Sequence, residues 1–108
     1  MIEENKQLWE ILVPTTFNDG VSISLKHHKK WDELVMAIAG GLTIMRPSKG
    51  RWTTSSGEEF LEDMIPVRIL CTREQIEEII QLTLGHYEQK AVLAFRVSNE
   101  AILKYSDG

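Results

Sequence analysis

Along the chain, the spacing of the apolar residues changes twice between the period of a strand and the period of a helix. Residues 8–17 alternate, with Trp9 and Ile11 on one face, as is typical of a half-buried strand. Residues 24–39 instead carry apolar side chains at spacings of three and four, which fall on one stripe of a helix. Gly40-Gly41 is expected to end this helix, because glycine adopts the left-handed C-terminal conformation without steric cost.

The second half of the chain repeats this order with clearer boundary signals. Residues 65–71 are predicted to form a strand, because alternate residues are again apolar. Thr72 and Gln75 then have the spacing of a reciprocal capping box, in which each side chain accepts from the other's backbone N–H. Gly85 lies inside the helical pattern that follows, so the second helix is expected to fray or end there.

Two further strands, at residues 42–46 and 91–97, complete the set. The order β-α-β-β-α-β favours two split β-α-β units, because crossovers are right-handed and connections are short. We therefore predict an α+β, ferredoxin-like sandwich with an antiparallel sheet of order 4-1-3-2 and both helices on one face. Residues 46–63, between the second and third strands, are predicted to form an extended hairpin that projects beyond the sheet.

The composition fits one domain over residues 1–108, with an ordered core at about 7–98. A net charge of −4 argues against a nucleic-acid partner, because phosphate binding requires clustered Lys and Arg. No apolar run approaches the ~20 residues that span a bilayer, and residues 1–6 lack the pattern of a signal peptide. The single Cys71 cannot form an internal disulfide, so a cytoplasmic protein is expected.

The predicted topology brings three polar segments to one end of the sheet. The first helix begins there and the second strand and second helix end there, so residues 18–30, 46–63 and 85–90 should meet. No other region of the sequence has this density of titratable and hydrogen-bonding side chains. A functional site is therefore expected at this end.

The start of the first helix carries the candidate binding residues Lys26, His28 and Lys30. A helix N-terminus favours an anion, because its backbone N–H groups are free and its dipole is positive. These residues are therefore candidates for binding a small anionic ligand. The alternative is a solvated face whose charge is balanced by Asp32 and Glu33.

We expect neither a metal centre nor a reactive thiol. His28 and Asp32 have the i, i+4 spacing that a metal could use, and His86 could approach across the helix pair. His28 also lies on the apolar stripe, so a partly buried histidine is the preferred interpretation. Cys71 lies on the inward face of its strand, where cysteine usually acts as a small buried hydrophobe.

Three residues at the same end are candidates for acid–base catalysis. His86 and Tyr87 close the second helix and Arg46 closes the second strand, so together they could hold and protonate a small acid substrate. Tyr87 also continues the buried stripe of the second helix, so packing explains its position equally well.

Arg51 and Trp52 on the predicted hairpin are the candidates for contacting a protein partner. An aromatic side chain on a protruding loop buries a large area at little entropic cost, and Trp and Arg are enriched in interface hot spots. The alternative is that Trp52 folds back and covers the core.

The sheet face opposite the helices is predicted to be unusually apolar. The residues assigned to it are Leu12, Pro14, Leu70, Val92, Ala94 and either Met45 or Ile44, beside Glu10, Arg68 and Arg96. A free sheet face is normally more polar, and an apolar patch of this kind usually meets another chain. A homo-oligomer is therefore expected, with homodimerisation through this face or through edge strands.

Part of the sequence resembles a known group of proteins. Residues 41–44 (Gly-Leu-Thr-Ile), followed by Gly50, Trp52 and then Glu62 before an apolar strand, resemble a group of small uncharacterised bacterial ferredoxin-like proteins. The resemblance covers about residues 31–95. It implies the fold, and it carries no functional residue with it.

Taken together, these patterns favour a homo-oligomeric binding or regulatory module that uses the 46–63 hairpin and needs no cofactor. The alternative is a cofactor-independent small-molecule enzyme of the dimeric α+β barrel type, with His86, Tyr87 and Arg46 in a cleft. A second group with this architecture, the trimeric signalling proteins, contacts partners through a long hairpin at the same position. Both comparisons are analogies of fold.

Overall fold

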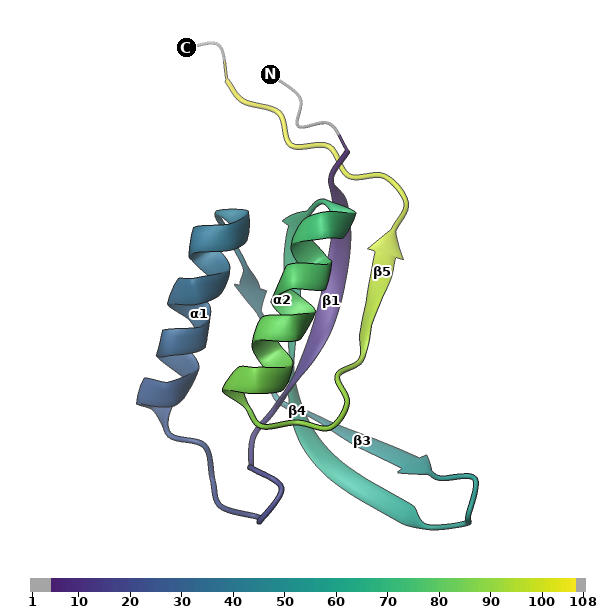
Figure 1. Ribbon diagram of the computed structural model, residues 1–108. Helices are drawn as coiled ribbons and strands as arrows, with labels where there is room; N and C mark the ends of the chain where they lie inside the picture. The colour runs from purple at the N-terminus through teal and green to yellow at the C-terminus, as the bar shows by residue number, and fades with distance from the viewer. Residues whose placement is uncertain (1–4, 107–108) are drawn as a thin grey trace.

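The computed structural model describes residues 5–106, which form one sheet covered on one side by two helices (Figure 1). Strand β1 (Gln7–Pro14) leads to helix α1 (Leu25–Ala39), and strands β2 (Thr43–Ile44), β3 (Ser48–Thr53) and β4 (Glu59–Cys71) follow. Helix α2 (Arg73–His86) and strand β5 (Ala94–Ser98) complete the chain order. The predicted α+β class is confirmed, and the extended hairpin is formed by β3 and the first part of β4.

The sheet has the strand order β2-β4-β1-β5, and β3 pairs with β4 as well. We call the two helices together with β1, β2, β5 and the part of β4 that pairs with β1 the body of the molecule. The four strands of the body follow the predicted order, but the sheet differs in detail because β3 makes it five-stranded. β1 pairs with β4 along its whole length, from Gln7 opposite Cys71 to Pro14 opposite Met64. The predicted strand 42–46 is only two residues long, because just Thr43 and Ile44 pair with β4.

The helix ends follow the capping signals in the sequence. Ser24 caps α1 and Gly40, at φ 81°, ends it in the left-handed conformation. At α2, the Gln75 N–H donates to Thr72 Oγ1 (3.2 Å) and the Thr72 N–H donates to Gln75 Oε1 (2.9 Å), so the capping box is confirmed. The Gln75 side chain also donates to the carbonyl of Ile38 (3.0 Å), which ties the start of α2 to the end of α1.

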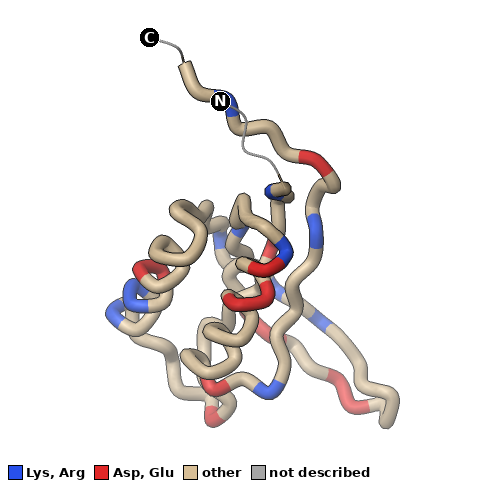
Figure 2. The backbone as a smooth tube through the Cα atoms, turned by 45° about the horizontal axis from the view of Figure 1, so that its top comes forward, with Lys and Arg blue, Asp and Glu red and all other residues tan. Residues whose placement is uncertain are grey.

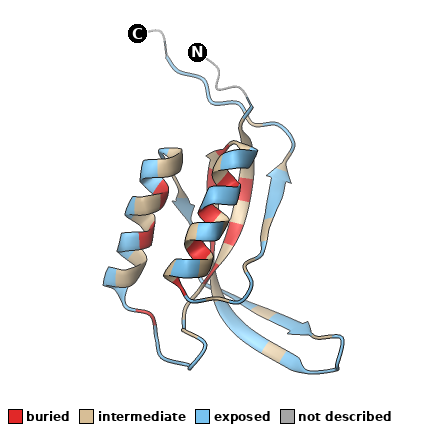
Figure 3. Cartoon of the chain, viewed as in Figure 1, coloured by how far each residue is buried: buried red, intermediate tan, exposed pale blue. Residues whose placement is uncertain are grey.

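The core lies between the helices and the sheet (Figure 3). Its members come from alternate positions of β1 and β4, from one stripe of each helix and from two flanking positions: Trp9, Ile11, Val13, Ile23, Trp31, Val35, Val67, Ile69, Cys71, Ile76, Ile79 and Tyr87. Each large side chain buried in this way contributes about 1.5–3 kcal/mol. The buried Trp31 indole donates to Thr83 Oγ1 (3.0 Å), and Thr83 donates to the carbonyl of Ile79 (2.6 Å).

The hairpin lies close to the predicted bounds of 46–63, but the strand predicted at 65–71 is longer, because β4 is one continuous strand of 13 residues. Its first part pairs with β3, from Ser48 opposite Met64 to Thr53 opposite Glu59, and its second part pairs with β1. β1 ends at Pro14 rather than at residue 17, because proline removes the backbone donor that would continue the ladder.

The predicted register of the last strand was wrong. β5 begins at Ala94, which lies opposite Ile11 and packs against the core together with Val92, while Arg96 lies opposite Trp9. Leu93 and Phe95 therefore face away from the helices, instead of Val92, Ala94 and Arg96. A shift of one residue exchanges the two faces of a strand, because side chains alternate with a period of two.

Candidate functional site

The start of α1 and the end of α2 meet at the end of the sheet where the polar segments were predicted to gather (Figure 1). The ring of His27 stacks on the ring of His86, with centroids 3.9 Å apart and planes 19° apart. His27 Nε2 lies 2.7 Å from the carbonyl oxygen of His86, and His86 Nε2 lies 2.8 Å from the carbonyl oxygen of His27. Because a carbonyl only accepts, each Nε2 carries a proton and donates it, which closes a reciprocal clasp.

His28 and Tyr87 form a second link beside this clasp. The Tyr87 hydroxyl and His28 Nδ1 are hydrogen-bonded at 2.7 Å. Tyr87 is fully buried, and burial raises the pKa of its hydroxyl far above the usual range. Burial also lowers the pKa of His28 from its ordinary value of 6.5, while the Asp32 carboxylate acts in the opposite direction. His28 is thus a partly buried histidine with a structural partner.

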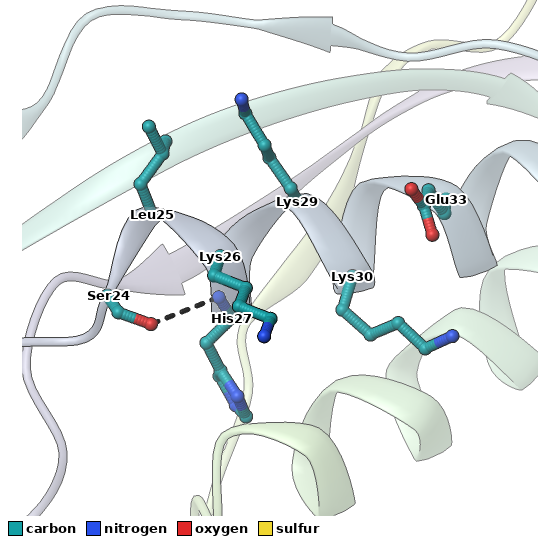
Figure 4. A pocket seen from close by; sticks show the side chains of 7 residues that line it. All are labelled: Ser24, Leu25, Lys26, His27, Lys29, Lys30 and Glu33. Carbon is teal, nitrogen blue, oxygen red and sulfur yellow. Dashed lines mark hydrogen bonds between the residues drawn. The ribbon is translucent and has the colours of Figure 1, made fainter.

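The lysines of α1 lie on the outer side of the helix and give its first turns a basic surface (Figures 2 and 4). A surface hollow of about 710 Å³ is lined by Ser24, Leu25, Lys26, His27, Lys29, Lys30 and Glu33. Leu25 and Lys29 extend to one side of the helix, and His27 and Lys30 extend to the other (Figure 4). The first turn holds no acidic residue, so nothing on the helix itself offsets its positive end there.

The three candidates for acid–base chemistry are not arranged as one set. The Tyr87 hydroxyl is engaged with His28, and the His86 ring is engaged with His27. Arg46 lies in the exposed stretch between β2 and β3, where its carbonyl accepts from the Ser48 hydroxyl (3.3 Å). Two surface hollows, at the start of α1 and beside residues 39–43, are lined by other residues.

The hairpin of β3 and the first part of β4 extends away from the helix pair (Figure 1). Trp52 is 48% exposed and stacks on Phe60 of the opposite strand, with ring centroids 4.7 Å apart. Beside this stack, Arg51 pairs with Glu59 at 3.1 Å. Trp52 therefore packs within its own hairpin instead of covering the core.

The face of the sheet opposite the helices carries many apolar side chains, from the body into the hairpin. Alternation along the paired strands assigns to it Leu8, Leu12, Pro14, Trp52, Phe60, Met64, Pro66, Leu70 and Phe95, with the charged Glu62 in the hairpin. Glu10 and Arg68 on the same face pair with each other at 3.0 Å. Gly50 lies on this face beside the terminal methyl group of Met64, which occupies the space that a Cβ at position 50 would take.

Of the three segments predicted to meet, residues 18–30 and 85–90 are joined by side-chain contacts. Asn18 donates to the carbonyl of Glu88 (2.9 Å), which adds to the histidine contacts between residues 18–30 and 85–90. The base of the hairpin is linked to the body by Thr15, which donates to the carbonyl of Asp63 (3.2 Å). Arg51 and Trp52 make their contacts inside the hairpin. The clasp of His27 was missed, although two histidines at meeting helix ends are a signal for it.

Other expectations concern groups inside the body. Cys71 is fully buried, and burial raises the pKa of its thiol to about 11, so the thiol is unreactive at neutral pH. Within residues 5–106, no group of three or more His, Cys, Asp or Glu side chains is placed to hold a metal ion. In the same range, no helix is both long and apolar enough to cross a membrane.

Comparison with known proteins shows the fold class and no family. No protein-family model matches the sequence, and no curated protein matches it either. The structure is similar to the periplasmic divalent cation tolerance protein CutA of Archaeoglobus fulgidus, with a TM-score of 0.67, 14% identity, and coverage of 92% of this chain and 88% of that one. It is similar to CutA1 of Oryza sativa with a TM-score of 0.63, 9% identity, and coverage of 94% and 83%.

A phage SAM lyase in complex with S-methyl-5'-thioadenosine has a similar structure as well, with a TM-score of 0.69, 11% identity, and coverage of 96% of this chain and 89% of that one. The chain thus has the ferredoxin-like α+β fold of these small proteins. At such identities the likeness shows the fold alone, and nothing in the comparisons reproduces the sequence pattern of residues 41–62.

Proposed function

We propose that this protein is a non-enzymatic binding or regulatory module that acts as a homo-oligomer and captures a protein partner with the 46–63 hairpin. The observation that carries the proposal is the half-exposed Trp52, stacked on Phe60 beside the Arg51–Glu59 pair. The stack holds the Trp52 ring in place, so a partner that covers it costs little side-chain entropy.

The shape of the chain supports a role for the hairpin in contact. The hairpin extends away from the helix pair, so neither helix covers it (Figure 1). A two-stranded hairpin is marginally stable in water by itself. Its extension away from the body is therefore best explained by a surface that it meets.

Self-association is proposed to use the apolar sheet face of the body. Leu93 and Phe95 are 60% and 41% exposed on the β5 side of this face. Its Glu10 and Arg68 already satisfy each other, so covering the face would not leave these charges unpaired. A second copy of the chain is the occupant that this argument favours, because both copies would bury the same apolar surface.

Two narrower points belong to the same proposal. Lys26 and Lys30 would bind a small anionic ligand on the outer side of α1, whereas His28 would act through its bond to Tyr87. We place the protein in the cytoplasm on the basis of its single buried thiol. Cation tolerance and SAM cleavage, which describe the similar proteins, are not transferred, and the separated positions of His86, Tyr87 and Arg46 do not favour the enzyme alternative.

The test compares two variants of the hairpin and one control variant with wild type. In one, residues 51–60 are replaced by Asn-Gly; in another, Trp52→Ala removes the ring; Leu25→Ala, at a 68% exposed position on α1, is the control. Light scattering and native mass spectrometry should report the same oligomer for all four proteins. The first two variants should lose the co-purifying partner, and the control should keep it. Partner capture by the shortened hairpin, or a monomeric wild type, would refute the proposal.

A further inference from the structure

At the opposite end of the body, one buried donor lacks a partner. Trp9 on β1 is 7% exposed, and its indole Nε1 is completely covered yet makes no hydrogen bond within residues 5–106. Buried N–H groups are nearly always bonded to protein or to water, so this one requires an explanation. The buried indole of Trp31, in contrast, has an acceptor, because it donates to Thr83 Oγ1 at 3.0 Å.

Two cationic side chains flank the same ring. The guanidinium carbon of Arg73 lies 5.7 Å from the centroid of the Trp9 ring, and that of Arg96 lies 5.9 Å from it. Arg73 pairs with Glu77 at 3.0 Å, but Arg96 has no carboxylate partner among the described residues. Both guanidinium groups lie over the Trp9 ring, and of these two arginines only Arg73 has a carboxylate partner among the described residues.

An unpaired indole N–H beside two guanidinium groups would be complemented by a small anion with several acceptor oxygens. We propose that Trp9, Arg73 and Arg96 form a binding site for a small oxyanion, of the phosphate or carboxylate class. Arginine suits this role because its planar fork binds two oxygens of one anion at once. Arg73 is the first residue of α2, so the positive end of that helix adds to the attraction.

Both arginines are exposed, so their side chains can move aside to admit the anion to the covered indole. The site lies on the helix side of the sheet and uses neither the hairpin nor the lysines of α1. Its three residues come from β1, α2 and β5, and the predicted register of the last strand had placed Arg96 on the other face.

The chain contains three indole N–H groups, which provide an internally controlled test. Protein labelled with ¹⁵N is titrated with sodium phosphate and, separately, with sodium acetate, each against sodium chloride at equal ionic strength. The Trp9 indole signal, assigned with Trp9→Phe, should shift and saturate with at least one oxyanion. The signals of Trp31, bonded to Thr83, and of exposed Trp52 should stay in place. The arm that saturates identifies the ligand class.

Arg96→Gln should weaken the binding at least about tenfold, because it removes a charged hydrogen-bond donor. Lys26→Gln, at the other end of the molecule, should leave it unchanged, and the amide spectrum shows whether each variant is folded. The proposal fails if the Trp9 signal does not respond to either oxyanion, if chloride gives the same response, or if folded Arg96→Gln binds as wild type does.

Discussion

Strand β4 lies partly in the body and partly in the hairpin. Comparing these two parts shows that the face of the strand on which a side chain lies does not by itself decide whether that side chain is buried. Ile69 and Leu61 lie on the same face of this strand, yet Ile69 is fully buried and Leu61 is 71% exposed. The helices cover only the part of β4 that pairs with β1 (Figure 1). The body is therefore stabilised by its core, whereas the hairpin depends on ladder hydrogen bonds and cross-strand pairs.

The largest test of this difference truncates one apolar residue in each region. Ile69→Ala should lower the free energy of unfolding by about 2–5 kcal/mol, because it leaves a cavity in the core. Leu61→Ala on the same face should change it by no more than about 0.5 kcal/mol. Urea unfolding followed by circular dichroism measures both. An equal loss at Leu61 would mean that the hairpin is buried in solution, and the contrast between the two regions would then be wrong.

A smaller effect is expected from removing one hydroxyl in each region. Thr83→Val leaves the buried Trp31 indole without its acceptor and should cost about 1–3 kcal/mol. Thr54→Val removes the bond to the Ser56 hydroxyl (2.8 Å) and the acceptor of the Glu58 N–H (3.2 Å) in the exposed hairpin turn, where water replaces the lost partners. Its cost should stay below about 1 kcal/mol. Thermal unfolding of the two variants gives the ranking, and a Thr54 cost equal to that of Thr83 would contradict it.

The two arginine–glutamate pairs that join neighbouring strands, one in each region, offer a finer comparison, since their lengths are nearly the same. Arg68 and Glu10 on the body are 38% and 12% exposed, whereas Arg51 and Glu59 on the hairpin are 72% and 62% exposed. Arg68→Gln should cost about 1 kcal/mol and Arg51→Gln about 0–0.5 kcal/mol, because exposed pairs are screened by water. Repeating the measurement in high salt should change the hairpin value more than the body value. The opposite salt response would argue against this assignment.

Local signals in the sequence located the body well. Thr72 and Gln75 identify the start of α2 without reference to any other part of the chain, and Gly40 identifies the end of α1, because caps act within one turn. The order of the strands in the body follows from the order of the elements and from short connections. These features depend on residues that are neighbours in sequence.

The features that were missed depend on pairing across the chain. The length of β4 is set by its two partners, β3 and β1. Residues 59–64 show no alternation of apolar residues that would predict a strand. The face on which Arg96 lies depends on the pairing of β5 with β1, in which Ala94 lies opposite Ile11 and Arg96 opposite Trp9, and a one-strand pattern does not contain this register. The clasp of His27 and His86 requires the meeting of two helix ends that are 59 residues apart.

The smallest expected effect concerns pH and belongs to the body alone, because all three histidines of the chain lie in it, at positions 27, 28 and 86. The pKa of His28 is lowered from 6.5, chiefly by burial, so the unfolded chain binds this proton more readily than the folded one. Stability should therefore be highest above about pH 6.5 and decline as the pH falls below it, until the folded protein takes up the proton as well. Urea unfolding from pH 7.5 to 5 measures this slope.

His28→Asn should reduce that slope, because asparagine keeps an acceptor for the Tyr87 hydroxyl and does not titrate. The raised pKa of Asp32 acts in the opposite sense, since burial favours its protonated form in the folded state, but it acts at lower pH, above its ordinary value of 3.8. Replacing residues 51–60 by Asn-Gly should leave the slope between pH 7.5 and 5 unchanged, because the hairpin contains no histidine. If the shortened protein lost the slope, the hairpin would be coupled to the helix ends, and the division into a self-sufficient body and a projecting hairpin would have to be abandoned.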